Sequence, residues 1–164
     1  MREQYMNSPL GLLKLSAKDG KLRSLEVVCE RGGDCPDATT QLAKKELDAY
    51  FRGKGKGFTV DIAPEGTAFQ QKVWMAMSQI PYGKVATYGE LARAIGRPTA
   101  CRAVANAVGK NPLLILLPCH RVVASKGLGG FSAGLPLKRR LLTLEKIEIA
   151  EKTPFSEKFL FTFG

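Results

Sequence analysis

Residues 87–112 read TYGELARAIGRPTACRAVANAVGKNP, and this stretch contains the pattern that decides the fold of the chain. Thr87 followed by Glu90 predicts a capping box, in which the threonine hydroxyl caps a helix and the glutamate reaches back to the start of its first turn. This helix is expected to stop at Gly96, and Thr99 can cap a further helix after a tight turn. Two short helices joined by a glycine-containing turn are typical of a helix-turn-helix motif.

The second helix of this motif, residues 100–108, is rich in alanine. A helix that reads bases in the major groove usually presents long polar side chains, and here mainly Arg102 and Asn106 could do so. The helix is therefore either tightly packed in the core or approaches a narrow groove without reading sequence. Residues 62–147 contain twelve Lys and Arg, three Glu and no Asp, a net charge of +9 out of +10 for the whole chain. This charge favours a surface that faces a polyanion such as nucleic acid.

Upstream of the motif, the sequence predicts a helix and, before it, a small α/β unit. A second capping box at Thr67–Gln70 begins a helix whose apolar residues recur at helical spacing as far as Ile80. Composition changes at Pro64–Gly66, which divides the chain into an α/β unit of residues 1–63 and a helical domain of residues 64–164. The elements predicted for the first unit are strands over 10–17 and 22–29 with a turn at Asp19-Gly20, a helix over 37–51 and a strand over 58–62.

Downstream, an apolar run, Leu113–Leu117, leads into the sequence PCHRVV at residues 118–123 and is expected to be buried. Cys119 stands beside His120, the single histidine of the chain. A basic neighbour favours the thiolate, which is the reactive form of cysteine. Neighbouring residues on a strand point to opposite faces, so a buried cysteine beside a satisfied histidine is the alternative interpretation.

Two further segments follow this dipeptide. Residues 126–134 are rich in glycine, which lets backbone approach a ligand closely, but they match no nucleotide-binding loop. A basic amphipathic helix is predicted over Pro136–Ile147, near whose end Glu145 lies. The aromatic residues of the tail, Phe155–Phe163, are expected to cover a face of the core.

Composition excludes several classes of protein. No run reaches the roughly 18 apolar residues of a membrane span, and no signal peptide is expected at the N-terminus. A single histidine excludes a multi-histidine metal site, and we expect neither a metal nor another cofactor. Four cysteines are too few for a disulfide scaffold, so a reducing, cytoplasmic location is predicted. Cys29 and Cys35 are expected to be free thiols, and a disulfide between them in an oxidising or thermophilic setting is the alternative.

The PCHRVV sequence, the helix-turn-helix, Asn111 and the glycine-rich segment together resemble the O6-alkylguanine-DNA alkyltransferases, also called methylated-DNA–protein-cysteine methyltransferases. The resemblance extends from about Phe69 to Lys146. It implies an RNase-H-like α/β unit at the N-terminus and a mainly α-helical C-terminal domain with a winged-helix-like helix-turn-helix. It also implies a monomer that binds double-stranded DNA containing O6-alkylguanine through the minor groove, with O4-alkylthymine as a further candidate substrate.

The resemblance implies a catalytic role for four residues. Cys119 would accept the alkyl group in one irreversible reaction per molecule, and His120 would generate its thiolate through a water. Glu145 would orient His120, by the logic of a catalytic triad. Asn111 would be the hinge that ties the recognition helix to the strand of the active site.

The remaining residues are assigned to DNA and substrate. Tyr88 would stabilise the departing guanine and help to rotate its phosphate, and Arg102 would enter the base stack where the guanine left. Ser132 and neighbouring backbone would contact O6 of the flipped base. The other candidate binding residues are Gly130, Phe131 and Arg121. Leu114, Phe131 and Ala133 depart from residues seen in some members and bear on the size of adduct accepted.

Three other functions compete with this reading. A helix-turn-helix regulator would need a dimer interface and base-reading side chains, and the alanine-rich helix offers few such side chains. A non-catalytic sensor of alkylated DNA would lack the acceptor, so Cys119 argues against it. A cysteine hydrolase would turn over repeatedly.

Overall fold

The computed structural model describes residues 1–149 and 155–163. The chain forms two compact units, which we describe separately. The N-terminal unit comprises Met1–Glu65 and Pro112–Leu114, and the C-terminal unit comprises Gly66–Asn111 and Ile115–Gly164.

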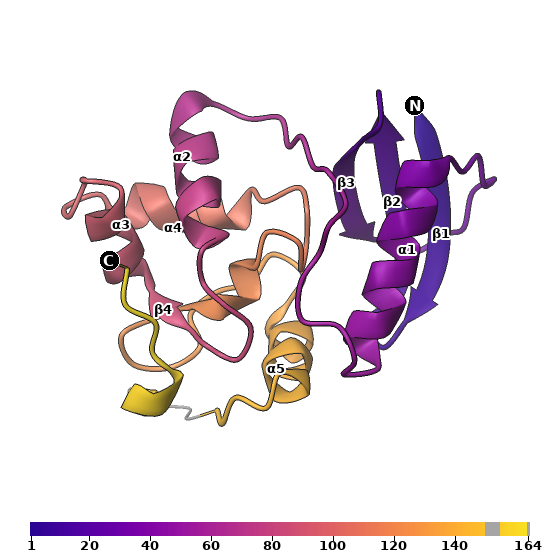
Figure 1. The fold of residues 1–164 in the computed structure, drawn as a ribbon. Coiled ribbons are helices and arrows are strands. Elements are labelled where there is room, and N and C mark those ends of the chain that lie inside the picture. The colour runs from indigo at the N-terminus through magenta and orange to yellow at the C-terminus, as the bar shows by residue number, and fades with distance from the viewer. Residues whose placement is uncertain (150–154, 164) are drawn as a thin grey trace. The chain divides into compact units, whose positions relative to one another are not determined.

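The N-terminal unit is a three-stranded antiparallel sheet with a helix across it (Figure 1). The predicted hairpin is confirmed, because Asp19 and Gly20 both adopt positive φ angles, 54° and 75°, as a tight hairpin turn requires. The predicted helix is also confirmed, and Asp37 caps it in a full capping box with Thr40. The first strand was not predicted. The elements are β1 (Arg2–Ser8), β2 (Gly11–Lys18), β3 (Lys21–Val27) and α1 (Ala38–Phe51).

The strand predicted over residues 58–62 is wrong. Only Ile62 makes a single bridge, to Leu22. The carboxylate of Glu46, on α1, accepts hydrogen bonds from the backbone amides of Thr59 and Val60 at 2.9–3.0 Å. These amides are therefore satisfied by a side chain and do not join a ladder.

The C-terminal unit is mainly helical, with a small parallel sheet at the site of interest (Figure 1). The strand β4 precedes the helix-turn-helix, and β5 begins at Val122, two residues after His120. The elements are α2 (Ala68–Met77), β4 (Ala86–Thr87), α3 (Tyr88–Ala94), α4 (Cys101–Gly109), the 3-10 turn η1 (Cys119–Arg121), β5 (Val122–Val123), α5 (Leu135–Leu144) and the 3-10 turn η2 (Glu157–Phe159).

The helix caps follow the sequence in two of three cases. The box at Thr67 and Gln70 is complete. At α3 the Thr87 hydroxyl accepts a hydrogen bond from the Glu90 amide, as predicted. The Glu90 carboxylate, however, accepts a hydrogen bond from the Thr87 hydroxyl and does not reach the backbone amide of Thr87, so the second half of the capping box is not formed. The predicted cap at Thr99 is wrong: α4 begins at Cys101 without a side-chain cap.

The packing interpretation of the alanine-rich helix is confirmed for one face of α4. Val104, Ala107 and Val108 are buried, and the indole Nε1 of Trp74 on α2 donates to the carbonyl of Ala107 at 2.8 Å. The opposite face, which includes Arg102, is exposed. The small side chains therefore allow close packing on one side while the other stays accessible.

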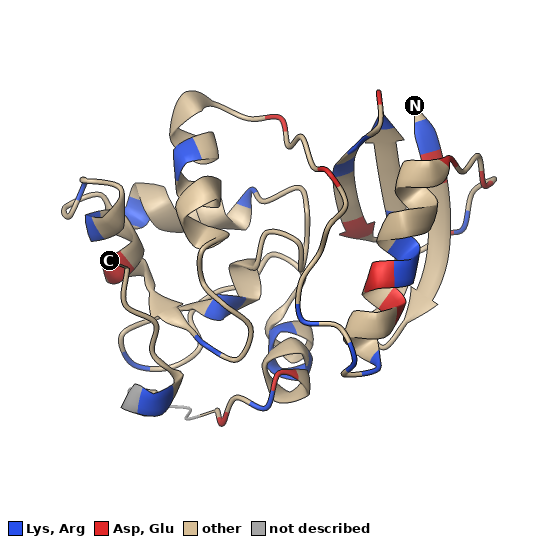
Figure 2. Ribbon diagram, viewed as in Figure 1, with Lys and Arg blue, Asp and Glu red and all other residues tan. Residues whose placement is uncertain are grey.

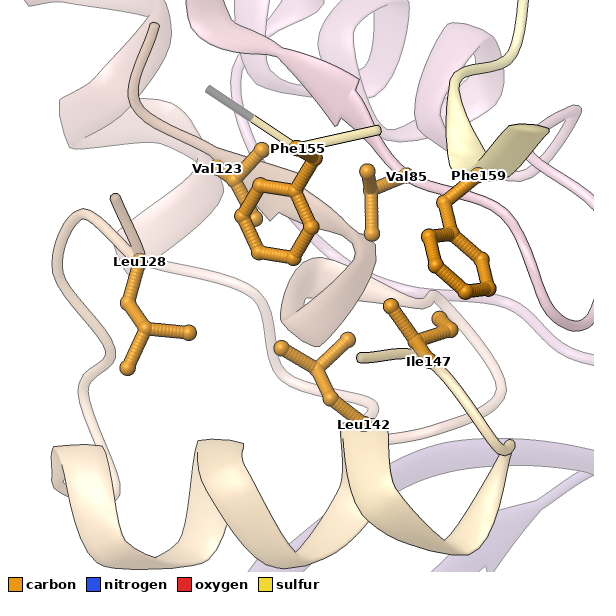
Figure 3. Packing of buried hydrophobic residues seen from close by; sticks show 7 residues of the cluster. All are labelled: Val85, Val123, Leu128, Leu142, Ile147, Phe155 and Phe159. Carbon is orange, nitrogen blue, oxygen red and sulfur yellow. The ribbon is translucent and has the colours of Figure 1, made fainter. Parts of the chain in front are cut away.

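A hydrophobic cluster joins the tail to the rest of the C-terminal unit (Figure 3). The backbone amide of Val85 donates to the carbonyl of Phe159 at 2.7 Å, and the amide of Phe161 donates to the carbonyl of Val85 at 2.8 Å. The prediction that the tail covers a core face is confirmed. Helix α5 ends three residues earlier than predicted, because Lys146 adopts a φ of 63° and reverses the chain. The cluster comprises Val85, Val123, Leu128, Leu142, Ile147, Phe155 and Phe159.

Other expectations concern burial and cysteines. Four residues of the run Leu113–Leu117 are buried, whereas Leu116 is half-buried. Cys29 and Cys35 are free thiols, as predicted. Among the described residues, no helix is long and apolar enough to cross a membrane.

Candidate active site

Positive charge is distributed over the helices and loops of the C-terminal unit (Figure 2). Between residues 66 and 149 the sequence has only three acidic residues, Glu90, Glu145 and Glu148. Glu145 is buried together with Arg121 and Lys138, so most of the excess positive charge of this unit lies at its surface. Such a surface suits a polyanion.

Cys119 begins the 3-10 turn η1 and does not lie on a strand. It is 3 % exposed, and the strand β5 that follows it pairs with β4. Burial raises the pKa of the thiol to about 11, although hydrogen bonds from the Asn111 side chain and nearby backbone amides lower it in part. The thiol is therefore protonated near neutral pH and needs a base before it can act as a nucleophile.

His120 and Glu145 form a fully buried pair. The imidazole Nε2 lies 2.5 Å from Glu145 Oε2, and neither side chain is accessible to solvent. The carboxylate also accepts from Arg121 Nε at 2.9 Å and from the Gly83 amide at 3.0 Å. Arg121 is itself held by the carbonyl of Ile80 at 2.8 Å, so the carboxylate is fixed from several directions.

The charges of this network decide the form of the histidine. Burial would raise the pKa of Glu145, but the hydrogen bonds from His120 and Arg121 and the charge of Arg121 outweigh it and lower the pKa to about 2. Burial lowers the pKa of His120, so the imidazole is neutral near pH 7. An ionised carboxylate only accepts, so Nε2 carries the hydrogen and Nδ1 has a free lone pair. Among the described residues Nδ1 has no hydrogen-bond partner, and a neutral imidazole with a free nitrogen can serve as a base.

Asn111 lies at the start of the segment that leads from α4 to Cys119, and its side chain reaches the end of that segment. Its Nδ2 donates to the carbonyl of Leu117 at 2.7 Å, and its side chain also contacts the thiol. Within the segment Ile115 has a φ of 72°, a conformation that β-branched residues rarely adopt. Such strain persists only where the surroundings hold it, and it marks this turn as constrained.

A cavity of about 240 Å³ opens over the thiol. This is below the roughly 300–1,000 Å³ of sites for drug-sized ligands and suits a smaller group such as one nucleobase. Tyr88 Oη donates to the carbonyl of Gly130 at 3.4 Å across one side of it. The cavity is lined by Tyr88, Ala105, Asn106, Val108, Gly109, Cys119, Gly130, Phe131 and Ser132.

The structure thus places the predicted residues in three groups. Cys119, Tyr88, Gly130, Phe131 and Ser132 line the cavity. His120, Glu145 and Arg121 form the buried network, and Asn111 connects α4 to the thiol. Arg102 is on the exposed face of α4 and does not line the cavity.

Sequence reasoning missed Lys138, which lies on α5 and is completely buried. It appeared in the sequence only as one residue of the basic amphipathic helix predicted over Pro136–Ile147. Leu141 and Leu142, three and four residues later, are also buried, so the helical spacing of Lys138 with these leucines was the available signal. Burial lowers the pKa of Lys138 to about 8.

The model of the family "6-O-methylguanine DNA methyltransferase, DNA binding domain" matches residues 68–147. The methylated-DNA–protein-cysteine methyltransferase of Methanosarcina acetivorans is 43 % identical over 87 % of this chain and 84 % of its own length. The Haemophilus influenzae protein of the same name is 39 % identical over 90 % and 88 %. The solved structure of Mycobacterium tuberculosis OGT in complex with DNA is 40 % identical and covers 89 % of this chain and 93 % of that one, with a TM-score of 0.81.

These likenesses agree with the arrangement around Cys119, and they span both units of the chain. The helix-turn-helix, the cavity and the buried histidine–carboxylate pair all lie in the segment that the family model matches. The chain therefore belongs to the methylated-DNA–protein-cysteine methyltransferases, which repair DNA by alkyl transfer.

Proposed function

We propose that this chain removes an alkyl group from O6 of guanine in double-stranded DNA and keeps it on Cys119. The observation that carries the proposal is a protonated thiol at the edge of a base-sized cavity, next in sequence to a neutral histidine held by an ionised glutamate. The arrangement has a nucleophile, a base and a group that orients the base.

The transfer is a displacement at the alkyl carbon. His120 Nδ1 takes the proton of the Cys119 thiol, through a water as the family resemblance implies. The sulfur then bonds to the alkyl carbon as the carbon–oxygen bond breaks, and the electron pair of that bond leaves with guanine O6. Burial raises the pKa of Tyr88, so its hydroxyl stays protonated and can donate to the departing base. Ser132 and the backbone of Gly130 and Phe131 face the same space and are assigned to base binding.

The substrate must reach this cavity from outside the duplex. An alkyl group on O6 is inaccessible inside a base stack, so the nucleotide has to be flipped out. Helix α4 has small residues beside an exposed Arg102, and we assign its exposed face to the minor groove with Arg102 in the vacated position. Asn111 links α4 to Cys119, which would join DNA binding to the reacting atom.

The thioether formed at Cys119 limits each protein molecule to one reaction. A carbon–sulfur thioether contains no activated leaving group, so each molecule reacts once. We further propose that the protein acts as a monomer in the cytoplasm, without a cofactor. We assign an RNase-H-like topology to the N-terminal unit and a winged-helix-like arrangement to the helix-turn-helix.

Intact-mass measurement after mixing with an O6-methylguanine duplex tests the proposal. We expect one added methyl group per molecule, located on Cys119 by peptide mapping. Cys119→Ser should take up none while still binding DNA, and Cys29→Ser, at an exposed cysteine of the N-terminal unit, is the matched control.

Three results would contradict the proposal. Methyl uptake by Cys119→Ser would assign another acceptor. Binding without uptake by the unmodified protein would favour a sensor or a regulator. Repair of several equivalents per molecule would favour a turnover enzyme.

A further inference from the structure

Lys138 is a buried cation, and among the residues that the structure describes its ammonium donates to backbone carbonyls alone. The side chain lies on α5 and has no exposed surface. Its Nζ donates to the carbonyls of Val122, Leu128 and Gly130 at 2.7, 2.5 and 2.9 Å. An ammonium has three hydrogens, so these three carbonyls use its full donor capacity.

The three carbonyls belong to two separate parts of the site. Val122 begins β5, directly after the turn that contains Cys119. Leu128 and Gly130 belong to the glycine-rich segment, and Gly130 lines the cavity and accepts the Tyr88 hydroxyl. The ammonium therefore ties the segment assigned to base binding to the strand that follows the acceptor cysteine.

The backbone of the glycine-rich segment is closely surrounded where it accepts the hydrogen bonds of Lys138. Gly129, between the two tied residues, has a φ of 73°. A Cβ there would lie 2.8 Å from Tyr88 Cε2 and 3.1 Å from the backbone nitrogen of Ala124. On the other side, the Leu128 side chain packs into the hydrophobic cluster with Val123 (Figure 3).

This lysine is an unfavourable choice for stability alone. Burial of an ammonium is costly unless it is well compensated, and the lowered pKa of Lys138 reflects that cost. An apolar side chain of similar length would fill the same space without placing a charge there. The positive charge of the same ammonium also lowers the pKa of the Cys119 thiol, although less than the hydrogen bond from the Asn111 side chain does.

We propose that Lys138 is a positioning residue for alkyl transfer, whose ammonium holds the Leu128–Gly130 backbone at a fixed place relative to Val122 and the acceptor sulfur. The inference rests on the proposed function. Guanine bound to the glycine-rich segment would then present its alkyl carbon to Cys119 at one distance and angle. Misplacement of reacting groups by about 1 Å can cost on the order of 10²-fold in rate.

The test compares two alkylating reagents on the full-length protein. Methyl transfer from an O6-methylguanine duplex requires the glycine-rich segment, whereas alkylation of Cys119 by iodoacetamide does not. For Lys138→Met we expect the first-order rate of methyl transfer to fall by about 10²-fold. The rate of iodoacetamide alkylation, measured by peptide mapping, should change less than about threefold. Arg140→Met, at an exposed position on the same helix, is the matched control and should transfer within about threefold of the unmodified protein.

A second variant displaces the same segment without touching the lysine. Gly129→Ala forces a Cβ against Tyr88 and Ala124, and it should reproduce the selective loss of methyl transfer even if Lys138→Met fails to fold. Methyl transfer near the unmodified rate in either folded variant would overturn the inference. A parallel fall with iodoacetamide would also overturn it, by assigning Lys138 to the thiol. Failure of the unmodified protein to accept a methyl group would instead overturn the proposed function.

Discussion

Two buried sets of contacts near Cys119, which we call its two sides, hold positive charge in different ways: one contains Arg121 and the other contains Lys138. On one side Arg121 is paired with the carboxylate of Glu145, which also binds His120. On the other side Lys138 is surrounded by backbone carbonyls. The first arrangement lowers the pKa of the carboxyl to about 2, whereas the second leaves the ammonium with a pKa lowered to about 8.

This difference separates two kinds of contribution. The network of His120, Glu145 and Arg121 balances its charges internally, so it should support both the fold and the proton transfer. The contacts of Lys138 compensate its charge only in part, so they should matter more for placing the substrate than for stability. Removal of one partner from a buried charge pair is strongly destabilising, which makes the first side the more sensitive one.

Glu145→Gln should have the largest effect, because it breaks the network at its centre. His120 would lose the ionised, acceptor-only partner that sets its tautomer, and Arg121 would be buried without a carboxylate. We expect methyl transfer to fall by about 10²–10⁴-fold, and iodoacetamide alkylation of Cys119 to fall with it. The free energy of unfolding should fall by about 3–5 kcal/mol in urea denaturation.

Glu148→Gln, at an exposed glutamate close in sequence, is the control for this change. It should leave both rates and the stability nearly unchanged. If Glu145→Gln slowed methyl transfer but left iodoacetamide alkylation intact, the two sides of Cys119 would not differ as described.

The pH dependence of stability should show the next largest effect. The pKa of Glu145 is lowered from 4.5 to about 2 in the folded protein, so its stabilisation is present above pH 4.5 and is lost as the pH falls towards 2. A shift of that size corresponds to about 3 kcal/mol. The lowered pKa of His120 acts in the same direction below pH 6.5, because unfolding lets the histidine take up a proton.

Urea denaturation of the unmodified protein and of Glu145→Gln between pH 6.5 and 3 measures this contribution. The unmodified protein should lose stability more steeply below pH 4.5 than the variant. Equal slopes for the two proteins would show that Glu145 does not carry the acid sensitivity.

Arg102→Ala should have the smallest effect and should act on neither side of Cys119. Arg102 is on the exposed face of α4 and outside the cavity. We expect repair of duplex DNA to slow by about ten- to a hundredfold, since each 1.4 kcal/mol of uncompensated base extrusion costs about tenfold. Transfer from the free O6-alkylguanine base should be unchanged.

Arg97→Ala, which removes one positive charge from the turn before α4, is the matched control. It should weaken duplex binding slightly at low salt without a selective loss of repair. Equal slowing of Arg102→Ala on duplex and free base would show that Arg102 supports the cavity.

Features that depend on neighbours in sequence were predictable. The Asp19-Gly20 turn and the cap at Thr67 require only local residue types, and the structure contains both. The cap at Thr99 and the strand over residues 58–62 were wrong. A tight turn ending at Ala100 precedes α4, and Glu46 takes the amides that a strand would have used.

By itself, the sequence determined which chemistry is present: one histidine beside a cysteine, a basic helical segment and a helix-turn-helix that resembles a known family. Tertiary structure alone decided how that chemistry is arranged. It brought Glu145 to His120 across 25 residues and turned Lys138 inward to bind three carbonyls. Spacing along a helix specifies which side chains share a face, but the protonation state of a buried group depends on the charges and dipoles that other segments place around it.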